Sequence, residues 1–341
     1  MKKHILLTLC ILGTLWCYAQ EMVEGYVFDS SSQKPLMGAT VYFDGSTIGA
    51  MSDENGYFSI ETEQKLSAPL VISFMGYQSF AISDPYGSDL SKIYLTPVSI
   101  QLREVVVTVK DDPFTREQKL RVFRIEFLGK TKMGRSCRIL NEDAINIYFD
   151  VTDNTLKAYS YDPIIIQNDY LKYKLTFNLD NFEIPFKTKS LDPIDMGDVY
   201  YIGTCFYEDT SEGSQQAINN RENAYLGSTL HFMRATANQV WKEEGFRFFL
   251  EKGWKKRIKP EKYITVTDEG DRKRVEITEK ITFSLKKKKY SKILADDSIF
   301  YIDQYGNHSP IKKVRLYGWA RNQRIGGQLP SDFEYNPDRD L

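Results

Sequence analysis

Cysteine, histidine and long apolar runs are scarce in this chain of 341 residues. Four cysteines and three histidines are present, and no two cysteines stand at the Cys-x-x-Cys spacing of a zinc site. Beyond the first twenty residues, no run is long and apolar enough for a membrane-spanning helix. The sequence therefore predicts no metal centre, no cofactor and no transmembrane segment.

An excess of charge of either sign is also lacking. Lysine and arginine number 45 against 46 acidic residues, for a formal charge of −1. Nucleic-acid binding normally needs a basic patch, so this balance gives it no support. Two basic runs, 252–262 and 286–289, could bind anionic groups, but acidic pairs such as Asp296-Asp297 balance their charge. We expect a solvated rim there.

The first residues have the pattern of a secretory signal peptide. A charged start, 1–4, precedes a short apolar run, and Ala19 is the small residue that signal peptidase accepts. We expect residues 1–19 to be removed and the protein to be exported, either to the periplasm or to a site associated with the outer membrane. Lipidation is the less favoured alternative, because Trp16 stands before Cys17 where a lipoprotein signal needs a small residue.

Only Cys137 and Cys205 remain after that cleavage. In an oxidising compartment they could form one disulfide, and sequence does not show whether they lie within bonding range. Two buried free thiols are at least as good an interpretation.

Short runs of β-branched and aromatic residues recur between Gly25 and Val107, separated by Gly, Pro, Asp and Asn. This pattern is typical of a small antiparallel β-sandwich. Asp53-Glu54-Asn55-Gly56 predicts a hairpin turn with Asn and Gly at positive φ, and Gly76 predicts another turn. The acidic cluster could hold calcium only with further oxygen ligands, and the apolar and aromatic residues that follow supply none.

Four motifs in this stretch carry a specific resemblance. They are Gly25-x-Val27-x-Asp29, Pro35-Leu36-x-Gly38-Ala39-Thr40-Val41, Ser52-Asp53-x-x-Gly56-x-Phe58-x-Ile60 and Ile72-Ser73-x-x-Gly76-Tyr77. In this order they resemble the carboxypeptidase regulatory-like domain, a seven-stranded transthyretin-like sandwich common in proteins of the Bacteroidetes. The resemblance implies a domain over 20–109 that accompanies peptidases and outer-membrane receptors without carrying catalytic residues itself.

The segment Leu102 to Thr108 is similar to the junction in TonB-dependent receptors, where a plug and a barrel follow. The residues after it lack the long series of alternating strands that a barrel needs. We therefore interpret the segment as the last strand of the sandwich, leading into a linker.

Residues 110–128 are predicted as that linker and a helix, in which Thr115 is the N-cap and Gln118 completes a capping box. A larger, β-rich α+β domain is expected over 129–341, with one helix near 220–241. Its first strands are predicted at 144–151, 155–161, 164–167, 171–179 and 190–206, and others lie between 263 and 319. The protein as a whole is predicted to be mainly β.

A dense polar cluster within the expected helix is the candidate binding site. Its members are Arg221, Tyr225, Ser228, His231 and Arg234. A serine and a histidine one turn apart suggest a hydrolase, but Leu230 stands where a nucleophile elbow would have its second glycine. A partly buried structural helix is the favoured interpretation, a ligand-binding cluster comes next, and no residue is predicted to be catalytic.

The sequence around this cluster, with Leu128-Gly129 and Cys137-x-Ile139-x-Asn141, is also similar to the region that follows the regulatory-like domain in a set of Bacteroidetes proteins. This second resemblance implies no mechanism. Three functions stay open. The favoured one is a non-catalytic envelope protein that binds or docks to another envelope protein or a glycan. The alternative is an accessory component of a TonB-dependent nutrient-uptake receptor. A hydrolase or carboxypeptidase is the least favoured, because Arg234 follows His231 where a zinc motif has glutamate.

Overall fold

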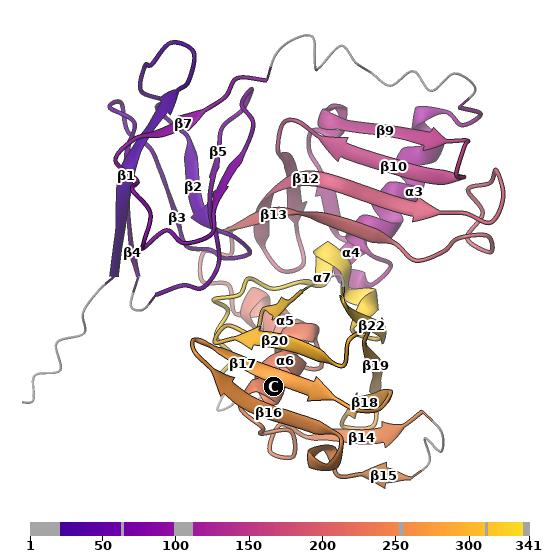
Figure 1. The fold of residues 1–341 in the computed structure, drawn as a ribbon. Coiled ribbons are helices and arrows are strands. Elements are labelled where there is room, and N and C mark those ends of the chain that lie inside the picture. The colour runs from indigo at the N-terminus through magenta and orange to yellow at the C-terminus, as the bar shows by residue number, and fades with distance from the viewer. Residues whose placement is uncertain (1–20, 63–64, 99–111, 252–255, 311–312, 337–341) are drawn as a thin grey trace, which may run out of the picture.

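The described residues form three hydrophobic cores, and all but a few members of each come from one stretch of the sequence (Figure 1). The structure, a computed structural model, describes residues 21–62, 65–98, 112–251, 256–310 and 313–336. The expected leader at 1–19 and the expected last strand at Leu102 to Thr108 lie outside these ranges and stay predictions.

The first core lies inside a β-sandwich, as the sequence predicts, and the described residues contribute seven strands to it. One sheet has the order β4-β1-β7 and the other β3-β2-β5-β6. Alternating residues of β1 point inward, so Val23 and Val27 are buried while Glu24 and Tyr26 are exposed. The strands are β1 (Glu21–Asp29), β2 (Thr40–Phe43), β3 (Gly49–Met51), β4 (Tyr57–Thr62), β5 (Leu70–Ser73), β6 (Phe80–Ile82) and β7 (Ile93–Leu95).

The Asp53 turn forms, but it is not the hairpin that the sequence predicts. It joins β3 of one sheet to β4 of the other, so the flanking strands do not pair with each other. Only Gly56 has a positive φ, of 77°. The Asp53 carboxylate accepts the N–H groups of Asn55 at 2.8 Å and Tyr57 at 2.9 Å, which closes the turn. The Gly76 turn joins the paired strands β5 and β6 as expected.

Helix α3 (Arg116–Leu128) begins at the predicted capping box and covers the middle sheet (Figure 1). Phe123 and Phe127 are fully buried and pack edge-on against Phe182 of β12. The sheet has the order β8-β11-β12-β10-β9, with β13 on the other edge of β12. It contains β8 (Cys137–Ile139), β9 (Ile145–Asp150), β10 (Thr155–Ser160), β11 (Ile164–Asn168), β12 (Tyr173–Pro185) and β13 (Tyr200–Asp209), beside helix α4 (Lys132–Arg135) and a 3-10 turn, η1 (Glu142–Ala144). Strand β13 begins later than the predicted Ser190, because Asp192-Pro193 and Gly197 form a loop.

The third core lies between two further sheets and helix α6 (Figure 1). One sheet has the order β15-β14-β18-β19-β22 and the other β16-β17-β20-β21. The predicted β-rich character of 129–341 is therefore seen, but this region holds two cores. The elements are β14 (Phe246–Leu250), β15 (Arg257–Ile258), η2 (Pro260–Lys262), β16 (Ile264–Glu269), β17 (Arg272–Ile277), β18 (Ile281–Leu285), β19 (Lys289–Ala295), β20 (Ile299–Asp303), β21 (His308–Ser309), β22 (Val314–Gly318), η4 (Arg321–Gln323) and α7 (Arg324–Gly327).

The single helix expected near 220–241 is instead two helices, α5 (Gln215–Tyr225) and α6 (Thr229–Ala237). Gly227 separates them with a φ of 77°, a conformation that a continuous α-helix does not contain. Ser228 then caps the second helix by accepting the N–H of His231. The break puts Arg221 and Tyr225 on α5 and His231 and Arg234 on α6, so the predicted cluster does not lie on one continuous helix.

A buried polar network joins the sandwich to the middle sheet. Asn178 of β12 donates to the hydroxyls of Tyr42 at 2.7 Å and Thr204 at 3.0 Å. Its amide oxygen accepts from Ser73 at 3.1 Å. Removing the Asn178 side chain alone would leave the Tyr42 hydroxyl buried without this donor, which is costly.

The backbones of the two parts also pair directly. Ser46 forms a parallel bridge with Phe206, and Gly45 donates to the carbonyl of Cys205 at 2.7 Å. Further along the chain, Ser331 donates to the carbonyl of Gly45, also at 2.7 Å. The sandwich is therefore built into the rest of the protein by contacts with two separate segments.

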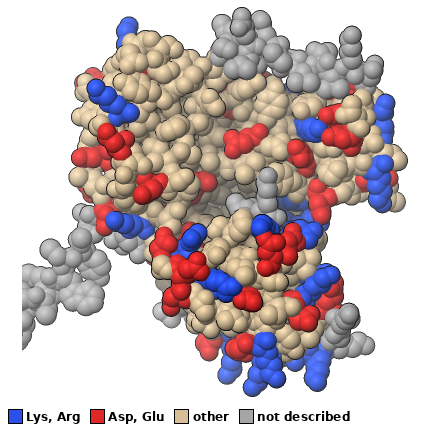
Figure 2. All heavy atoms as spheres, viewed as in Figure 1, with Lys and Arg blue, Asp and Glu red and all other residues tan. Residues whose placement is uncertain are grey.

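Charges of both signs lie intermixed over the C-terminal sheets, whereas the face of the sandwich in this view is mostly uncharged (Figure 2). Lys292 pairs with Glu251, and Lys313 pairs with Asp297. Exposed pairs of this kind contribute little to stability and leave no strong field. Lys289, predicted as part of a solvated rim, turns inward and donates to the carbonyl of Leu226 at 2.6 Å.

No helix in the described part of the chain combines the length and apolar character needed to cross a membrane.

Candidate functional site

Arg221, the first member of the predicted cluster, fastens helix α5 to the middle sheet. Its guanidinium lies 3.7 Å from the ring centre of Tyr173 and donates to the carbonyls of Leu171 and Lys172, both at 2.8 Å. It also forms a two-pronged pair with Asp209, at 2.7 and 2.8 Å, and this cation lowers the pKa of that carboxyl. All of these partners belong to the protein itself.

His231 is fully buried and both of its ring nitrogens are occupied. Nδ1 accepts the N–H of Gly227 at 2.9 Å, so Nε2 carries the proton and faces Glu244 Oε2 at 2.9 Å. Burial lowers the pKa of the imidazole, against the opposite effect of Glu244. The Ser228 hydroxyl accepts the backbone N–H of His231, whereas the two ring nitrogens are bonded to Gly227 and Glu244. This geometry does not form the nucleophile–base pair of a hydrolase.

Arg234 and Tyr225 hold the C-terminal segment in place. Arg234 donates to the carbonyls of Tyr305 at 2.9 Å and of Ser331 and Phe333, both at 2.7 Å. Tyr225 stacks on His231 with ring centres 4.7 Å apart and on Tyr335 at 5.0 Å. The structure thus brings Tyr225, His231 and Arg234 together and leaves Arg221 on a separate contact. These interactions fit the structural interpretation of the cluster.

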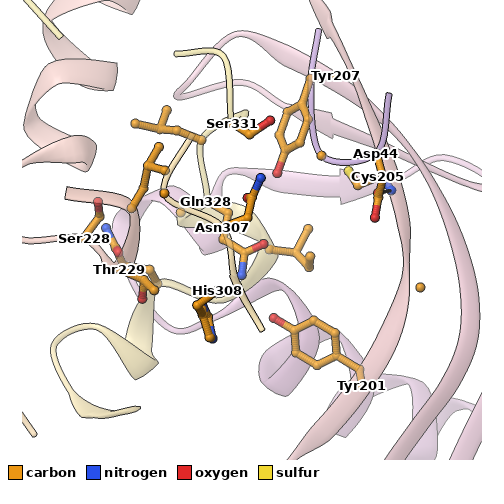
Figure 3. A pocket seen from close by; sticks show the side chains of 18 of the residues that line it. Asp44, Tyr201, Cys205, Tyr207, Ser228, Thr229, Asn307, His308, Gln328 and Ser331 are labelled. Atoms are coloured by element: carbon orange, nitrogen blue, oxygen red, sulfur yellow. Dashed lines mark hydrogen bonds between the residues drawn. The ribbon is translucent and has the colours of Figure 1, made fainter. Parts of the chain in front are cut away.

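A cavity of about 390 Å³ lies where the sandwich, β13 and the C-terminal segment meet (Figure 3). The sandwich contributes Asp44 and Gly45, and helix α6 contributes its first turn with Ser228 and Thr229. Of the predicted site residues, only Ser228 lines it. The principal polar and aromatic residues of the wall are Phe177, Tyr200, Tyr201, Cys205, Tyr207, Asn307, His308, Gln323, Gln328 and Ser331.

The pKa values of two ionisable groups in the wall are shifted in the direction that favours the neutral form. Burial raises the pKa of Asp44 to about 6, although its carboxylate accepts the Cys205 N–H at 2.8 Å. Desolvation lowers the pKa of His308 to about 4, so its imidazole is neutral at pH 7. Lysine, arginine and glutamate are absent from the described wall. The cavity is therefore close to uncharged, with Asp44 its one acid.

Tyr201 and Tyr207 of β13 point their hydroxyls into the cavity from opposite sides (Figure 3). Burial raises the pKa of each phenol, so both remain protonated donors. Cys205 between them is buried with its thiol pKa raised well above the usual value, which makes it a poor nucleophile. Cys205 and Cys137 are both free thiols, the second of the two interpretations that the sequence left open.

Sequence reasoning missed this cavity because its wall comes from segments far apart in the chain. The pattern around Tyr305-Gly306-Asn307-His308 predicts only a turn, and Asp44 and Gly45 belong to a different core. One signal was available in β13, where Tyr200, Tyr201 and Tyr207 give an edge strand three tyrosines. Within the described residues, no group of three or more metal-ligating side chains lies together.

The profile of one protein family, the CarboxypepD_reg-like domain, matches residues 23–107. The N-terminal sandwich is therefore a carboxypeptidase regulatory-like domain, as the motifs in the sequence indicate. The comparison with curated proteins gives no match.

Solved structures show only partial overlaps. A mutant type II cohesin–X-dockerin complex from Acetivibrio cellulolyticus is 26% identical, with 23% of this chain and 55% of that chain covered and a TM-score of 0.17. A second mutant of the complex is 21% identical over 33% and 77%, with a TM-score of 0.18. A 9R-lipoxygenase from Cyanothece PCC8801 is 8% identical over 64% and 48%, at 0.17. This chain thus spans about half of the first of these, and overlaps of this quality imply no function.

Proposed function

We propose that this is an exported, non-catalytic binding protein of a Bacteroidetes cell envelope, and that the cavity at the junction holds its ligand. The observation that carries this proposal is the cavity itself. Small-molecule sites usually have volumes of about 300–1,000 Å³ and lie between domains, and this cavity meets both criteria.

The position of the sandwich supports a binding role for it. Asp44 and Gly45 lie in its β2–β3 loop and form part of the cavity wall. The same loop is held by hydrogen bonds to Cys205 and Ser331. The regulatory-like domain therefore completes the site, and its removal would open one wall to solvent.

Filling the cavity tests this function. Thr229→Trp places an indole at the first turn of α6, where Thr229 is half-buried in the wall. Thr265→Trp adds the same group to an exposed position of β16 and serves as the matched control. A library of small polar and apolar fragments is screened on both variants and the wild type by saturation-transfer NMR. We expect signals with the wild type and Thr265→Trp that vanish with Thr229→Trp. Equal signals in all three would overturn the proposal.

A second function, docking to an envelope partner such as a nutrient-uptake receptor, is favoured by a separate surface. Met37, Met51 and Met75 are 67%, 68% and 71% exposed at one end of the β3-β2-β5-β6 sheet. Thr40 of β2 pairs with Met51 of β3 on one side and with Ser73 of β5 on the other. Met37 lies just before Thr40 and Met75 just after Ser73, so the three methionines lie near one another. Flexible methionine side chains are common at protein-binding surfaces.

Met51→Glu with Met75→Glu tests this docking function, and Ile194→Glu, at an equally exposed site on the middle domain, is the control. Co-purification of an outer-membrane barrel with the wild type and the control, but not with the double variant, would favour docking. Its retention by all three would exclude this surface as the docking site.

A further inference from the structure

We propose that the junction cavity takes a neutral, hydroxyl-rich ring, that is, a saccharide unit without acidic groups. This inference rests on the proposed function and names the class of ligand. It follows from the charge of the wall, the kind of polar groups in it and their distribution.

The charge of the wall excludes the commonest polar ligands. A phosphate or carboxylate taken out of water needs a cation or an array of donors to replace its hydration. The described wall contains no lysine or arginine, and Arg324, which contacts Tyr201 without lining the cavity, pairs with Glu126. Desolvation lowers the pKa of His308, so it is neutral at pH 7. Asp44 would repel an anion further. Nucleotides, sugar phosphates and uronic acids are therefore poor candidates.

A cationic ligand is also disfavoured. Asp44 is the only acid among the described residues of the wall, and one of its oxygens already accepts the N–H of Cys205 at 2.8 Å. Its carboxyl group is partly protonated near pH 6. A single carboxylate in this state gives an ammonium group little compensation for lost water.

The wall instead offers neutral hydrogen-bonding groups on several sides. Tyr201 and Tyr207 contribute hydroxyls from β13, and Thr229 contributes one from α6. Gln328, which hydrogen-bonds to Tyr201, contributes an amide from the segment after α7. Hydroxyl and amide groups both donate and accept, as sugar hydroxyls do. Because these groups surround the cavity, a ligand bearing hydroxyls around a ring would satisfy more of them than a flat apolar molecule.

Apolar side chains fill the space between these groups. Phe177, Leu230, Ile325 and Leu329 line the same cavity. A pyranose presents C–H faces as well as hydroxyls, so it matches a wall of mixed character. A lipid chain would leave the polar groups unpaired, at a cost for each buried one.

Isothermal titration calorimetry of the full mature chain tests the inference. The probes are glucose, galactose, maltose, cellobiose and lactose, each compared with glucuronic acid and glucose 6-phosphate. Longer neutral oligosaccharides form a separate arm. A binding signal with the mono- or disaccharides would identify the ligand as a free sugar. A signal with the longer chains alone would identify it as the end of a glycan.

We expect at least one neutral saccharide to bind at least tenfold more tightly than its charged analogue. Gln328→Ala and His308→Phe should each weaken binding about threefold to tenfold, the effect of losing one neutral hydrogen bond. Gln216→Ala, an exposed glutamine on α5, is the control and should leave binding unchanged. Melting curves of the variants confirm folding, and Gln328 is exposed enough for its replacement to be tolerated.

Three outcomes would overturn the inference in different ways. Equal or tighter binding of a charged analogue would contradict the neutral ligand. If no saccharide binds while other fragments bind in a manner that Thr229→Trp abolishes, the sugar assignment is wrong and the proposed function stands. If no ligand of any class responds to Thr229→Trp, both are wrong.

Discussion

The α5–α6 cluster and the junction cavity are both rich in polar and aromatic groups, but they use them differently. In the cluster, Arg221, His231 and Arg234 direct their polar atoms at partners within the protein. In the cavity, Tyr201, Tyr207 and Gln328 surround a volume of about 390 Å³. The stretch of sequence that is densest in functional groups therefore holds the fold together. The cavity that could bind a ligand lies beside it.

The two regions also differ in charge. The cluster holds two formal cations, Arg221 paired with Asp209 and Arg234 bonded to backbone carbonyls, which suits groups that fix a helix to its neighbours. The described wall of the cavity holds one acid, Asp44, with a raised pKa, and one histidine, His308, with a lowered pKa. Changes in the cluster should therefore affect stability, and changes in the cavity should affect binding and pH dependence.

The largest expected effect is the loss of Arg221. Arg221→Ala leaves the carbonyls of Leu171 and Lys172 without their donor and removes the cation from the face of Tyr173. We expect a loss of about 3 kcal/mol in the free energy of unfolding, measured by urea denaturation.

The control for that variant is Arg138→Ala, which breaks an exposed pair with Asp169. It should change the free energy of unfolding by less than about 1 kcal/mol. Similar effects of the two substitutions would contradict the structural role of Arg221.

His308→Phe should change how stability depends on pH. The folded pKa of His308, about 4, lies below its ordinary value of 6.5, so the neutral form contributes stability above pH 6.5 that is lost as the pH falls through 4. The wild type should therefore lose up to about 2 kcal/mol more than the variant between pH 6.5 and 4. Parallel curves of unfolding free energy against pH would show that His308 is not desolvated at the cavity.

Asp44→Asn should change the pH dependence of stability in the opposite direction. The folded pKa of about 6 lies above the ordinary 3.8, so this group favours the fold below pH 3.8 and that contribution is lost as the pH rises through 6. Asparagine can still accept the Cys205 N–H, so the variant should gain about 1 kcal/mol relative to the wild type at pH 7.5 and nothing at pH 3.5. Thermal melting at the two pH values measures this difference, and a variant less stable at pH 7.5 would contradict it.

The smallest stability effect is expected for Thr229→Trp. The indole enters existing space at the start of α6, so the free energy of unfolding should change by less than about 1 kcal/mol. Chemical denaturation beside Thr265→Trp measures it. A loss of several kcal/mol would mean that the wall is closely packed there and that the cavity does not admit a ligand.

Local sequence signals predicted local structure well. Turn residues and the alternation of apolar and polar residues predicted the sandwich, and Thr115 with Gln118 predicted the start of α3. Both features are determined by neighbouring residues. The break between α5 and α6 was missed, although Gly227-Ser228 is a glycine followed by an N-cap residue. The cavity could not be predicted from the sequence, because it depends on how Asp44, β13 and the segment after α7 meet in space. No local sequence pattern encodes that arrangement.

The most direct test of the difference between the two regions is amide hydrogen exchange with and without an excess of the neutral saccharides. We expect slower exchange at 200–207, 306–309 and 328–331, which border the cavity, and no change over α5. Protection of α5 with unchanged exchange around the cavity would contradict the account and place the binding site at the cluster.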